Sequence, residues 1–287
     1  MSVVVDRHSF ALPRSGAPEV EIFAIGDIHG RVDLLDALLD EAAREPRRAA
    51  RRAIVFLGDL VDRGPDSLGA IDLAIGAARR IGAEESIALM GNHETMMRLA
   101  LDPTTSLPDA IDALEAWVAN GGGRTIAEFA DPNAAPATPE ALVGAIRAAL
   151  PPRVAAWLEG LLPHWRSHEV LFVHAGVNPR VELEDFLAVP WNTPLWRLDE
   201  NRHWAWVRWP FLDCAPGPEG WSGLFVVHGH TPNDARAHAS HADQIAGFRL
   251  NLDAGSGLTG VAEMAILRGD RAEVVAARGP TNRMLRG

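Results

Sequence analysis

Three short apolar segments are each followed by a polar turn and then by a helical pattern, and this repeat constrains the fold more than any other feature. The segments 20–25, 53–57 and 86–90 have the length and apolar content of buried strands. After each turn, apolar residues recur at three- and four-residue spacing, as in an amphipathic helix. Successive strand–turn–helix units of this kind predict a parallel sheet covered by helices, and therefore an α/β fold.

The second half of the chain supplies further strands. The apolar segments 170–173 and 224–227 each lead into a turn that contains histidine. More strands are expected at 248–252, 261–267 and 271–276, where glycine-rich turns separate apolar runs. We expect these last segments to form an antiparallel second sheet.

Two segments interrupt this pattern. Residues 1–18 contain two prolines and no clear period, and we expect them to form an irregular N-terminal arm. Residues 102–166 keep helical spacing but are broken by proline and glycine, which predicts an α-helical insertion. We expect this insertion to cover one side of the sheet and to border the functional site. Because no linker divides the chain, residues 1–287 are expected to form a single domain.

Charge limits the partners that this chain can have. Acidic residues number 38 and basic residues 27, for a net charge of −11. We therefore expect no binding to nucleic acid or to membranes, because both attract basic patches. The N-terminus lacks the pattern of a signal peptide, and the single Cys214 cannot form an internal disulfide. A cytoplasmic location follows as an expectation.

Side chains that can bind a metal occupy the turns after five apolar segments: Asp27 and His29, Asp59, Asn92, His174, and His230. One such residue is more often a hydrogen-bonded turn residue than a ligand, but five such turns in one chain favour a shared site. Open α/β sheets place their ligands at the carboxyl ends of the strands. Oxygen and imidazole ligands without thiolate suit Mn, Fe or Zn.

The same turns carry five motifs: Gly26-Asp27-Ile28-His29-Gly30, Gly58-Asp59-Leu60-Val61-Asp62-Arg63-Gly64, Gly91-Asn92-His93-Glu94, His174-Ala175-Gly176 and Gly229-His230-Thr231. The set resembles the phosphoprotein phosphatase (PPP) branch of the calcineurin-like metallophosphoesterases, in its bacterial type. The motifs span residues 26–231, which is most of the chain. The resemblance implies an α/β sandwich of two mixed β-sheets flanked by helices, with an α-helical insertion.

The resemblance also implies a dinuclear metal centre. Asp27 and His29 would hold the first metal, and Asp59 would bridge both. The second metal would be held by Asn92, His174 and His230. We expect two divalent metal ions, with Mn as the first choice and Fe or Zn as alternatives.

Three further residues acquire roles by the same resemblance. His93 would donate a proton to the leaving oxygen, and Asp62 would orient the His93 ring. Arg63 would bind phosphate oxygens with its planar guanidinium. The reaction implied is hydrolysis of a phosphate ester by direct attack of a hydroxide that bridges the two metals.

Three points stay open in the sequence. The second phosphate-binding arginine is Arg208 or its rival Arg197. His228 would share a strand face with His230, and the family pattern assigns the ligand role to His230. Six tryptophans lie within residues 190–221, where they either pack a loop region or line the substrate site.

The function implied is that of a metal-dependent phosphomonoesterase, namely a bacterial-type Ser/Thr protein phosphatase. Its partner would be a phosphoprotein or a small phosphate ester. The alternative is a symmetrical diadenosine tetraphosphate (dinucleoside polyphosphate) hydrolase with the same fold and metal set. Relatives of that kind tend to lack an aspartate at the position of Asp62 and to carry aspartate in place of Glu94. A catalytically silent binding module is disfavoured because all six ligand positions are filled.

Overall fold

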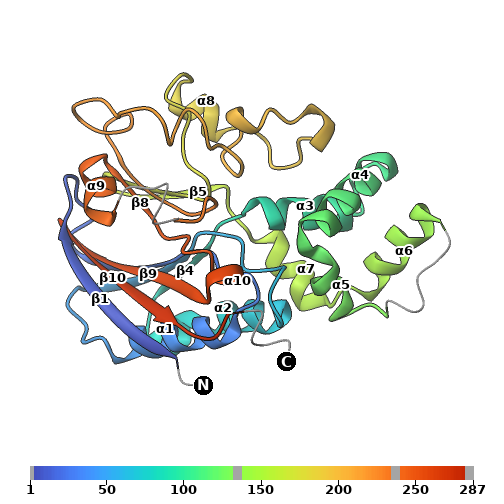
Figure 1. Cartoon of the computed structure of the whole chain (residues 1–287), viewed down its shortest axis with the longest axis horizontal. Helices are drawn as coiled ribbons and strands as arrows, with labels where there is room; N and C mark the ends of the chain where they lie inside the picture. Colours follow the sequence, from blue (N-terminus) through green and yellow to red (C-terminus); the bar gives the residue numbers. More distant parts are fainter. Residues whose placement is uncertain (1–2, 132–137, 234–239, 282–287) are drawn as a thin grey trace.

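The computed structural model describes residues 3–131, 138–233 and 240–281, and within them two β-sheets form a sandwich (Figure 1). The larger sheet has the strand order β1 (Val4–Ala11), β10 (Arg271–Arg278), β9 (Val261–Arg268), β2 (Val20–Ile25), β3 (Arg51–Phe56) and β4 (Glu85–Ala88). The smaller sheet has the order β5 (His164–Ser167), β6 (Val170–Val173), β7 (Phe225–His228) and β8 (Arg249–Asn251).

Both sheets are mixed. In the larger sheet β2, β3 and β4 pair in parallel, whereas β9 runs antiparallel to β2. Strands β10 and β1 continue the larger sheet in antiparallel pairs. In the smaller sheet β6, β7 and β8 are parallel and β5 is antiparallel to β6. The expected α/β sandwich of two mixed sheets flanked by helices is confirmed.

The central strands are buried on both faces. Ile22 and Ala24 of β2 belong to the core between the sheets, together with Phe172 of β6. Phe23 and Ile25 point to the opposite face, because successive side chains of a strand alternate. There they pack against the two helices α1 (Val32–Arg44) and α2 (Ser67–Ile81). Burial on both faces explains why these strands read as continuous apolar runs in the sequence.

The N-terminal segment departs from expectation. Strand β1 occupies Val4–Ala11 and pairs antiparallel with β10, so residues 1–18 are not an irregular arm throughout. This strand lies at the edge of the sheet, and its side chains are exposed or half-buried. An edge strand can carry many polar and charged residues, and the segment therefore lacks the apolar run that marks the buried strands.

The expected antiparallel second sheet at the C-terminal end is wrong. Strand β8 joins the smaller sheet in parallel with β7, whereas β9 and β10 extend the larger sheet beside β2. Strands β9 and β10 are antiparallel to each other, as expected, but their neighbours lie near the start of the chain. Which distant strand completes a sheet depends on packing between layers, and a local sequence pattern does not encode it.

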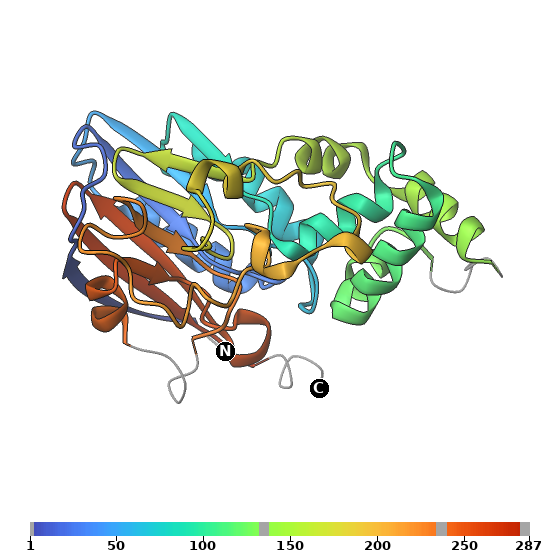
Figure 2. The same cartoon turned by 90° about the horizontal axis from the view of Figure 1, so that it is seen from above.

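A helical part of the chain projects beyond the sandwich (Figure 2). It comprises α3 (Asn92–Leu101), α4 (Leu107–Trp117), the kinked turn η1 (Val118–Gly122), α5 (Gly123–Ala127), α6 (Pro139–Ala149) and α7 (Pro152–Glu159). Residues 132–137 of the expected insertion lie outside the described residues. Trp117 and Ile146 of this part share one apolar core with Leu171 of β6, so the helices pack firmly onto the sandwich.

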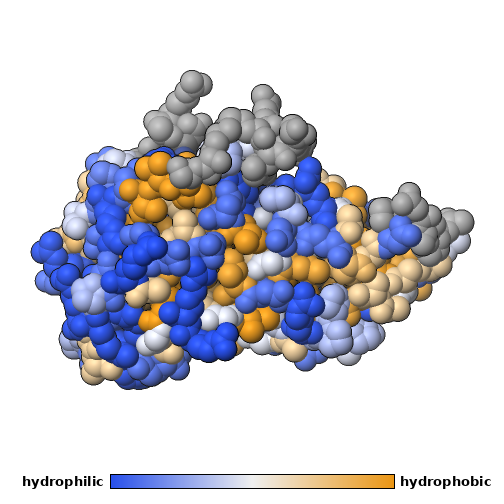
Figure 3. Space-filling model, turned by 90° about the horizontal axis from the view of Figure 1, so that it is seen from below, coloured by the Kyte–Doolittle hydropathy of each residue, from blue (hydrophilic) through white to orange (hydrophobic). Residues whose placement is uncertain are grey.

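Short helices occupy the remaining loops: α8 (Leu183–Leu187), η3 (Leu195–Arg197), η4 (Glu200–Arg202), α9 (His241–Ala246) and α10 (Ser256–Thr259). The face shown in Figure 3 mixes hydrophilic side chains with smaller apolar patches. Among the described residues, no single helix is long and apolar enough to cross a membrane. Helices α6 and α7 reach that length and composition only together, and a 97° bend separates them.

Candidate metal centre

The expected ligands come from the carboxyl ends of strands in both sheets. Asp27 and His29 follow β2, Asp59 follows β3, and Asn92 begins α3 after β4. His174 follows β6, and His230 follows β7. All six side chains are buried.

Tight turns bring these side chains together. His29, Asp59 and His230 have positive φ values of 49°, 51° and 70°, a left-handed conformation that is costly for residues other than glycine. Gly91 leaves room for the bridging carboxylate, because a Cβ there would lie 2.1 Å from Oδ1 of Asp59. Strained backbone of this kind is found mainly at functional sites.

Two groups of metal-binding atoms converge on Asp59. Among the described residues, His29, Asp59 and His93 form one triad, and Asp59, His174 and His230 form the other. Within each triad one possible ligand atom of each residue lies within 4.8 Å of the others. Oδ2 of Asp59 lies 3.7 Å from Nε2 of His29, and Oδ1 lies 3.4 Å from Nε2 of His174. Each carboxylate oxygen thus faces a different triad.

One ring nitrogen of each ligand histidine is held by a backbone carbonyl. The three hydrogen bonds run from His29 Nδ1 to Val61 O at 2.9 Å, from His174 Nδ1 to Leu57 O at 2.9 Å, and from His230 Nε2 to Trp206 O at 3.1 Å. Each of these nitrogens donates, so the other nitrogen of each ring presents a lone pair to the site. Histidines that bind metals are oriented in this way.

The lone pairs of His174 and His230 face another acceptor. Oδ1 of Asn92 lies 2.9 Å from Nδ1 of His230 and 3.2 Å from Nε2 of His174. With the opposite ring nitrogens donating, no hydrogen lies between these atoms, and a cation would satisfy all of them. The donor set of imidazole, carboxylate and amide oxygen fits a divalent transition metal.

Burial keeps the ligand histidines neutral. It lowers the pKa of His29 and of His230 well below the usual value and also lowers the pKa of His174. Burial alone would raise the pKa of the Asp59 carboxyl, but His174 and the other surrounding imidazoles outweigh it and hold that pKa low. Neutral imidazoles around an ionised carboxylate are the protonation states that metal binding requires.

Asp27 is an expected ligand of the first metal, and its side chain is fully buried. Its carboxylate lies outside both triads, and its Oδ2 accepts a hydrogen bond from the backbone N–H of His230 at 3.1 Å. Burial, and then the charges of Asp253 and Asp59, raise the pKa of Asp27 well above its usual range. The third position of the first triad belongs to His93, which the sequence motif assigns to proton donation.

His93 and Asp62 form a fully buried pair. Nδ1 of His93 lies 2.6 Å from Oδ2 of Asp62. Burial lowers the pKa of His93, but the charge of Asp59 and the hydrogen bond to Asp62 outweigh it, so the pKa is raised overall. The structure therefore brings together the two residues to which the resemblance assigned paired roles.

Arg63 lies between the two rings of the first triad. One terminal nitrogen donates to Nε2 of His29 at 2.9 Å, and the other donates to Nε2 of His93 at 2.7 Å. The guanidinium thus occupies the space between the ring nitrogens of His29 and His93, which these residues would offer to a bound ligand. Its two parallel N–H groups suit the oxygens of a phosphate group.

The structure separates the two candidates for the second arginine. The charge of Arg208 adds to burial in lowering the pKa of His174 and His230, so its guanidinium lies close to the second triad. Arg197 instead lies over the exposed ring of Trp196, 4.6 Å from its centroid. Arg208, and not Arg197, is therefore the candidate whose charge acts on these histidines.

The open points about His228 and the tryptophans also have structural answers. His228 lies outside both triads and packs edge-on against Phe211 at 5.0 Å. Trp204, Trp206 and Trp221 are buried and pack the interior, whereas Trp196 and Trp209 are exposed. The backbone of Trp206 also supports the centre, since its carbonyl holds His230.

Two buried carboxylates were given no structural role by the sequence reasoning. Glu94 accepts hydrogen bonds from the backbone N–H groups of Asp59 at 2.7 Å, of Leu60 at 2.8 Å and of Gly91 at 3.0 Å. Burial, and then the charge of Asp59, raise its pKa to about 7. Its spacing after Gly91 is the signal that could have found it, because a Glu three residues after a helix N-cap reaches back to the N-cap N–H.

Asp253 is the second of these carboxylates. It follows β8 and lies beside Asp27, and burial raises its pKa to about 6. The signal available was the one already used for the ligands, namely an aspartate in the turn after a strand.

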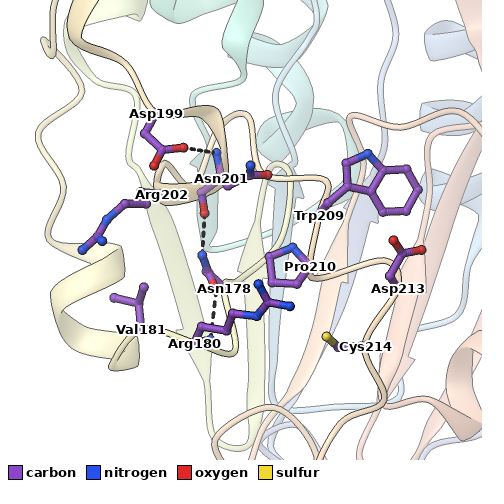
Figure 4. A pocket seen from close by; sticks show the side chains of 10 residues that line it. All are labelled: Asn178, Arg180, Val181, Asp199, Asn201, Arg202, Trp209, Pro210, Asp213 and Cys214. Atoms are coloured by element: carbon purple, nitrogen blue, oxygen red, sulfur yellow. Dashed lines mark hydrogen bonds between the residues drawn. The ribbon is translucent and has the colours of Figure 1, made fainter.

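A polar pocket of about 410 Å³ includes Trp209 and Pro210, the two residues that follow Arg208 in the sequence (Figure 4). Asn178, Arg180, Val181, Asp199, Asn201, Arg202, Trp209, Pro210, Asp213 and Cys214 line it. Figure 4 shows Arg180 pointing toward the space between Pro210 and Cys214. Trp209 is 49% exposed, so its indole face is available to a ligand.

Comparison with known proteins agrees with this geometry. The family model for calcineurin-like phosphoesterases matches residues 20–258. The chain is 36% identical over 101 residues to Serine/threonine-protein phosphatase 1 of Salmonella typhimurium, over 35% of this chain and 38% of that protein. It is 30% identical over 168 residues to the symmetrical bis(5'-nucleosyl)-tetraphosphatase of an Acidovorax species, over 58% of this chain and 48% of that protein. The matched segments thus span less than half the length of either relative.

A solved structure shares the fold. The cold-active protein-tyrosine phosphatase of a psychrophilic Shewanella species superposes with a TM-score of 0.52 and 16% identity. The superposition covers 87% of this chain and 79% of that one. At this identity the likeness concerns the fold alone.

Proposed function

The chain belongs to the calcineurin-like phosphoesterase family, and from that premise we propose that it is a metal-dependent phosphomonoesterase, a Ser/Thr protein phosphatase of bacterial type. The observation that carries this proposal is the buried pair of His93 and Asp62 beside Arg63. The pair supplies a proton donor at the point where a phosphate ester would bind. The curated phosphatase relative is consistent with it.

The first metal would be held by Asp27, His29 and Asp59, and the second by Asp59, Asn92, His174 and His230, so that Asp59 is common to both. Bound there, two divalent ions, for which we propose Mn, would polarise a phosphoryl oxygen and activate water as the nucleophile. Asn92 contributes a neutral oxygen that adds coordination without further negative charge. Asp27 also accepts a hydrogen bond from the backbone N–H of His230, and Asp253 accepts one from the backbone N–H of Gly255.

Arg63 would bind the phosphate group of the substrate. Its two terminal nitrogens donate to His29 and His93 in the structure, and a phosphate group offers two acceptor oxygens for the same N–H groups. When the guanidinium turns to phosphate, Nε2 of His93 becomes free to carry a proton. Binding of the substrate would therefore allow His93 to act as the general acid.

His93 would then pass a proton from Nε2 to the leaving oxygen. Asp62 accepts from Nδ1 at 2.6 Å, which fixes the ring and stabilises its positively charged form. A serine or threonine alkoxide is a poor leaving group, so protonation during departure matters most for such substrates. This requirement is what links the pair to a phosphomonoesterase.

The proposal is tested by the substrate preference of the Mn-loaded enzyme. Steady-state kcat/KM is measured side by side on phosphoserine peptides, p-nitrophenyl phosphate and dinucleoside polyphosphates. We expect the phosphopeptides to exceed the dinucleotides. A preference for the dinucleotides by orders of magnitude would contradict the phosphatase proposal.

The second candidate is symmetrical hydrolysis of dinucleoside tetraphosphates. The observation in its favour is the polar pocket that Trp209 lines, where the exposed indole of this residue could stack on a nucleobase. The Acidovorax relative carries that activity in its name. The same assay decides between the two candidates.

Replacement of Arg208 by alanine is expected to lower kcat/KM about 10- to 100-fold, the usual effect of losing a hydrogen bond to a charged group. The reason is the position of its charge next to His174 and His230. Arg197→Ala is the matched control, because its guanidinium stacks on Trp196 at the surface. Equal kcat/KM for both variants would show that Arg208 does not bind substrate.

A further inference from the structure

We propose that residues 117–128, here called the clasp, position Asp62 and Arg63 for the reaction. The clasp begins at the last residue of α4, passes through η1 and α5, and ends one residue beyond α5. It belongs to the helical part of the chain rather than to either sheet. The inference rests on the proposed function, in which Asp62 orients His93.

The clasp donates two groups to the carboxylate of Asp62. Nε1 of Trp117 lies 2.8 Å from Oδ2 and 3.0 Å from Oδ1, and the Thr125 hydroxyl donates to Oδ1 at 2.6 Å. All three side chains are fully buried. Donors on both oxygens fix the plane of the carboxylate, and therefore the direction in which Oδ2 meets Nδ1 of His93.

The clasp also holds the backbone of the same loop. Asp62 and Arg63 have φ values of 74° and 64°, so two successive side-chain-bearing residues adopt the left-handed conformation. Such strain persists only where surrounding contacts enforce it. Here the N–H of Asp62 donates to the Thr125 hydroxyl at 3.1 Å, and the N–H of Arg63 reaches the carbonyl of Gly121 at 3.4 Å.

Gly121 fits closely against Arg63. Its φ is 109°, and a Cβ at this position would lie 2.9 Å from Cγ of Arg63. The carbonyl of Asn120 lies 3.4 Å from Nε of Arg63. The kinked turn η1 therefore limits where the stem of the arginine can lie, and with it the position of the guanidinium between His29 and His93.

The far end of the loop is anchored as well. The carboxylate of Glu128 accepts from the backbone N–H groups of Ser67 and Leu68, both at 2.7 Å. These residues begin α2, so the negative charge also lies at the N-terminus of that helix. Residues of the clasp thus contact both ends of the loop, at Asp62 and at the start of α2.

The roles follow from this arrangement. Trp117 and Thr125 touch neither a candidate metal ligand nor the phosphate position, and they act through Asp62, so they are positioning residues. Loss of one donor would leave the carboxylate free to rotate away from the His93 ring. Turnover would fall while Arg63 still binds phosphate.

The first test is steady-state kinetics of single variants of the Mn-loaded enzyme on a phosphoserine peptide. Thr125→Val and Trp117→Phe are expected to lower kcat about 10- to 100-fold, the range for residues that orient a functional group, with KM unchanged. Thr125→Ser keeps the hydroxyl and is expected to restore kcat. Trp157→Phe is the matched control, because among the described residues Nε1 of Trp157 has no hydrogen-bond partner.

The second test separates positioning from general structural damage. The loss in kcat for Thr125→Val should be larger on a phosphoserine peptide than on p-nitrophenyl phosphate, since the nitrophenolate leaves without a proton. In a background of His93→Asn, Thr125→Val should cause no further loss on p-nitrophenyl phosphate, because the residue that it positions is absent.

Each outcome is decisive. Wild-type kcat for Thr125→Val and Trp117→Phe, together with a severe loss for His93→Asn, would overturn the clasp and leave the proposed function standing. Equal losses on both substrates that add to the loss of His93→Asn would also overturn the clasp, because they indicate a structural effect. Full activity of His93→Asn itself would overturn the proposed role of His93 and the clasp together.

Discussion

Replacement of Asp59 by asparagine is expected to lower kcat by roughly 10³-fold or more and to reduce the metal content of the purified protein. Oδ2 of Asp59 faces His29 and Oδ1 faces His174, so one carboxylate serves both triads. Asparagine keeps the shape but removes the negative charge that two cations would share. Bound metals supply several kcal/mol of transition-state stabilisation, and each 1.36 kcal/mol is tenfold in rate.

Metal content is measured by elemental analysis of the protein and kcat on p-nitrophenyl phosphate. Asp72→Asn is the matched control, because Asp72 pairs with Arg153 at the surface of the molecule. The control is expected to keep full activity and full metal content. A fully active Asp59→Asn enzyme with unchanged metal content would refute the bridging role.

Replacement of His93 by asparagine, and separately of Asp62 by asparagine, is expected to lower kcat by roughly 10²- to 10⁴-fold, the range for a lost general acid. The physical reason is the buried hydrogen bond of 2.6 Å that joins the two side chains. Asparagine at position 62 keeps an acceptor oxygen but removes the charge that stabilises a protonated imidazole. Steady-state kinetics on a phosphoserine peptide measures the effect.

Metal content distinguishes this role from ligation, which matters because His93 also completes the first triad with His29 and Asp59. A proton donor can be removed without loss of metal, whereas removal of a ligand lowers metal content. His8→Asn, at an exposed position of edge strand β1, serves as the control. Metal loss in His93→Asn would make His93 a ligand, and unchanged turnover would exclude both roles.

The strands that surround the centre could be predicted because they are buried on both faces. Residues 20–25 and 170–173 were located to the residue, and the other site-bearing strands within two residues of their ends. Each of these segments is a continuous apolar run that ends at the turn bearing a ligand. The positions of the ligands in the fold therefore followed from the strand ends.

The rest of the larger sheet could not be predicted in the same way. Strand β1 has the sequence VVDRHSFA, whose polar residues are compatible with an edge strand but do not identify one. Its partner β10 lies at the other end of the chain, and pairing across that separation is decided by the assembled sheet. The placement of β9 beside β2 has the same cause.

The contacts that hold Asp62 beside His93 also could not be predicted from the sequence motifs. Trp117 and Thr125 contact Asp62 from 55 and 63 residues away in the sequence. Local spacing shows that α4 is amphipathic, but not that one buried indole N–H faces a carboxylate rather than the core. Asp27 likewise has a contact that its motif does not indicate, since its carboxylate accepts a hydrogen bond from the backbone N–H of His230.

The two β-sheets contribute candidate ligands to the same centre. Asp59 and Asn92 follow strands of the larger sheet, and His174 and His230 follow strands of the smaller sheet. A cation held by all four binds only when the sheets are packed against each other, and binding to the folded form alone adds about 2.7 kcal/mol of stability when free metal is 100 times Kd. We therefore expect thermal unfolding to depend on metal supply, because such a cation would join the two layers of the sandwich across their interface.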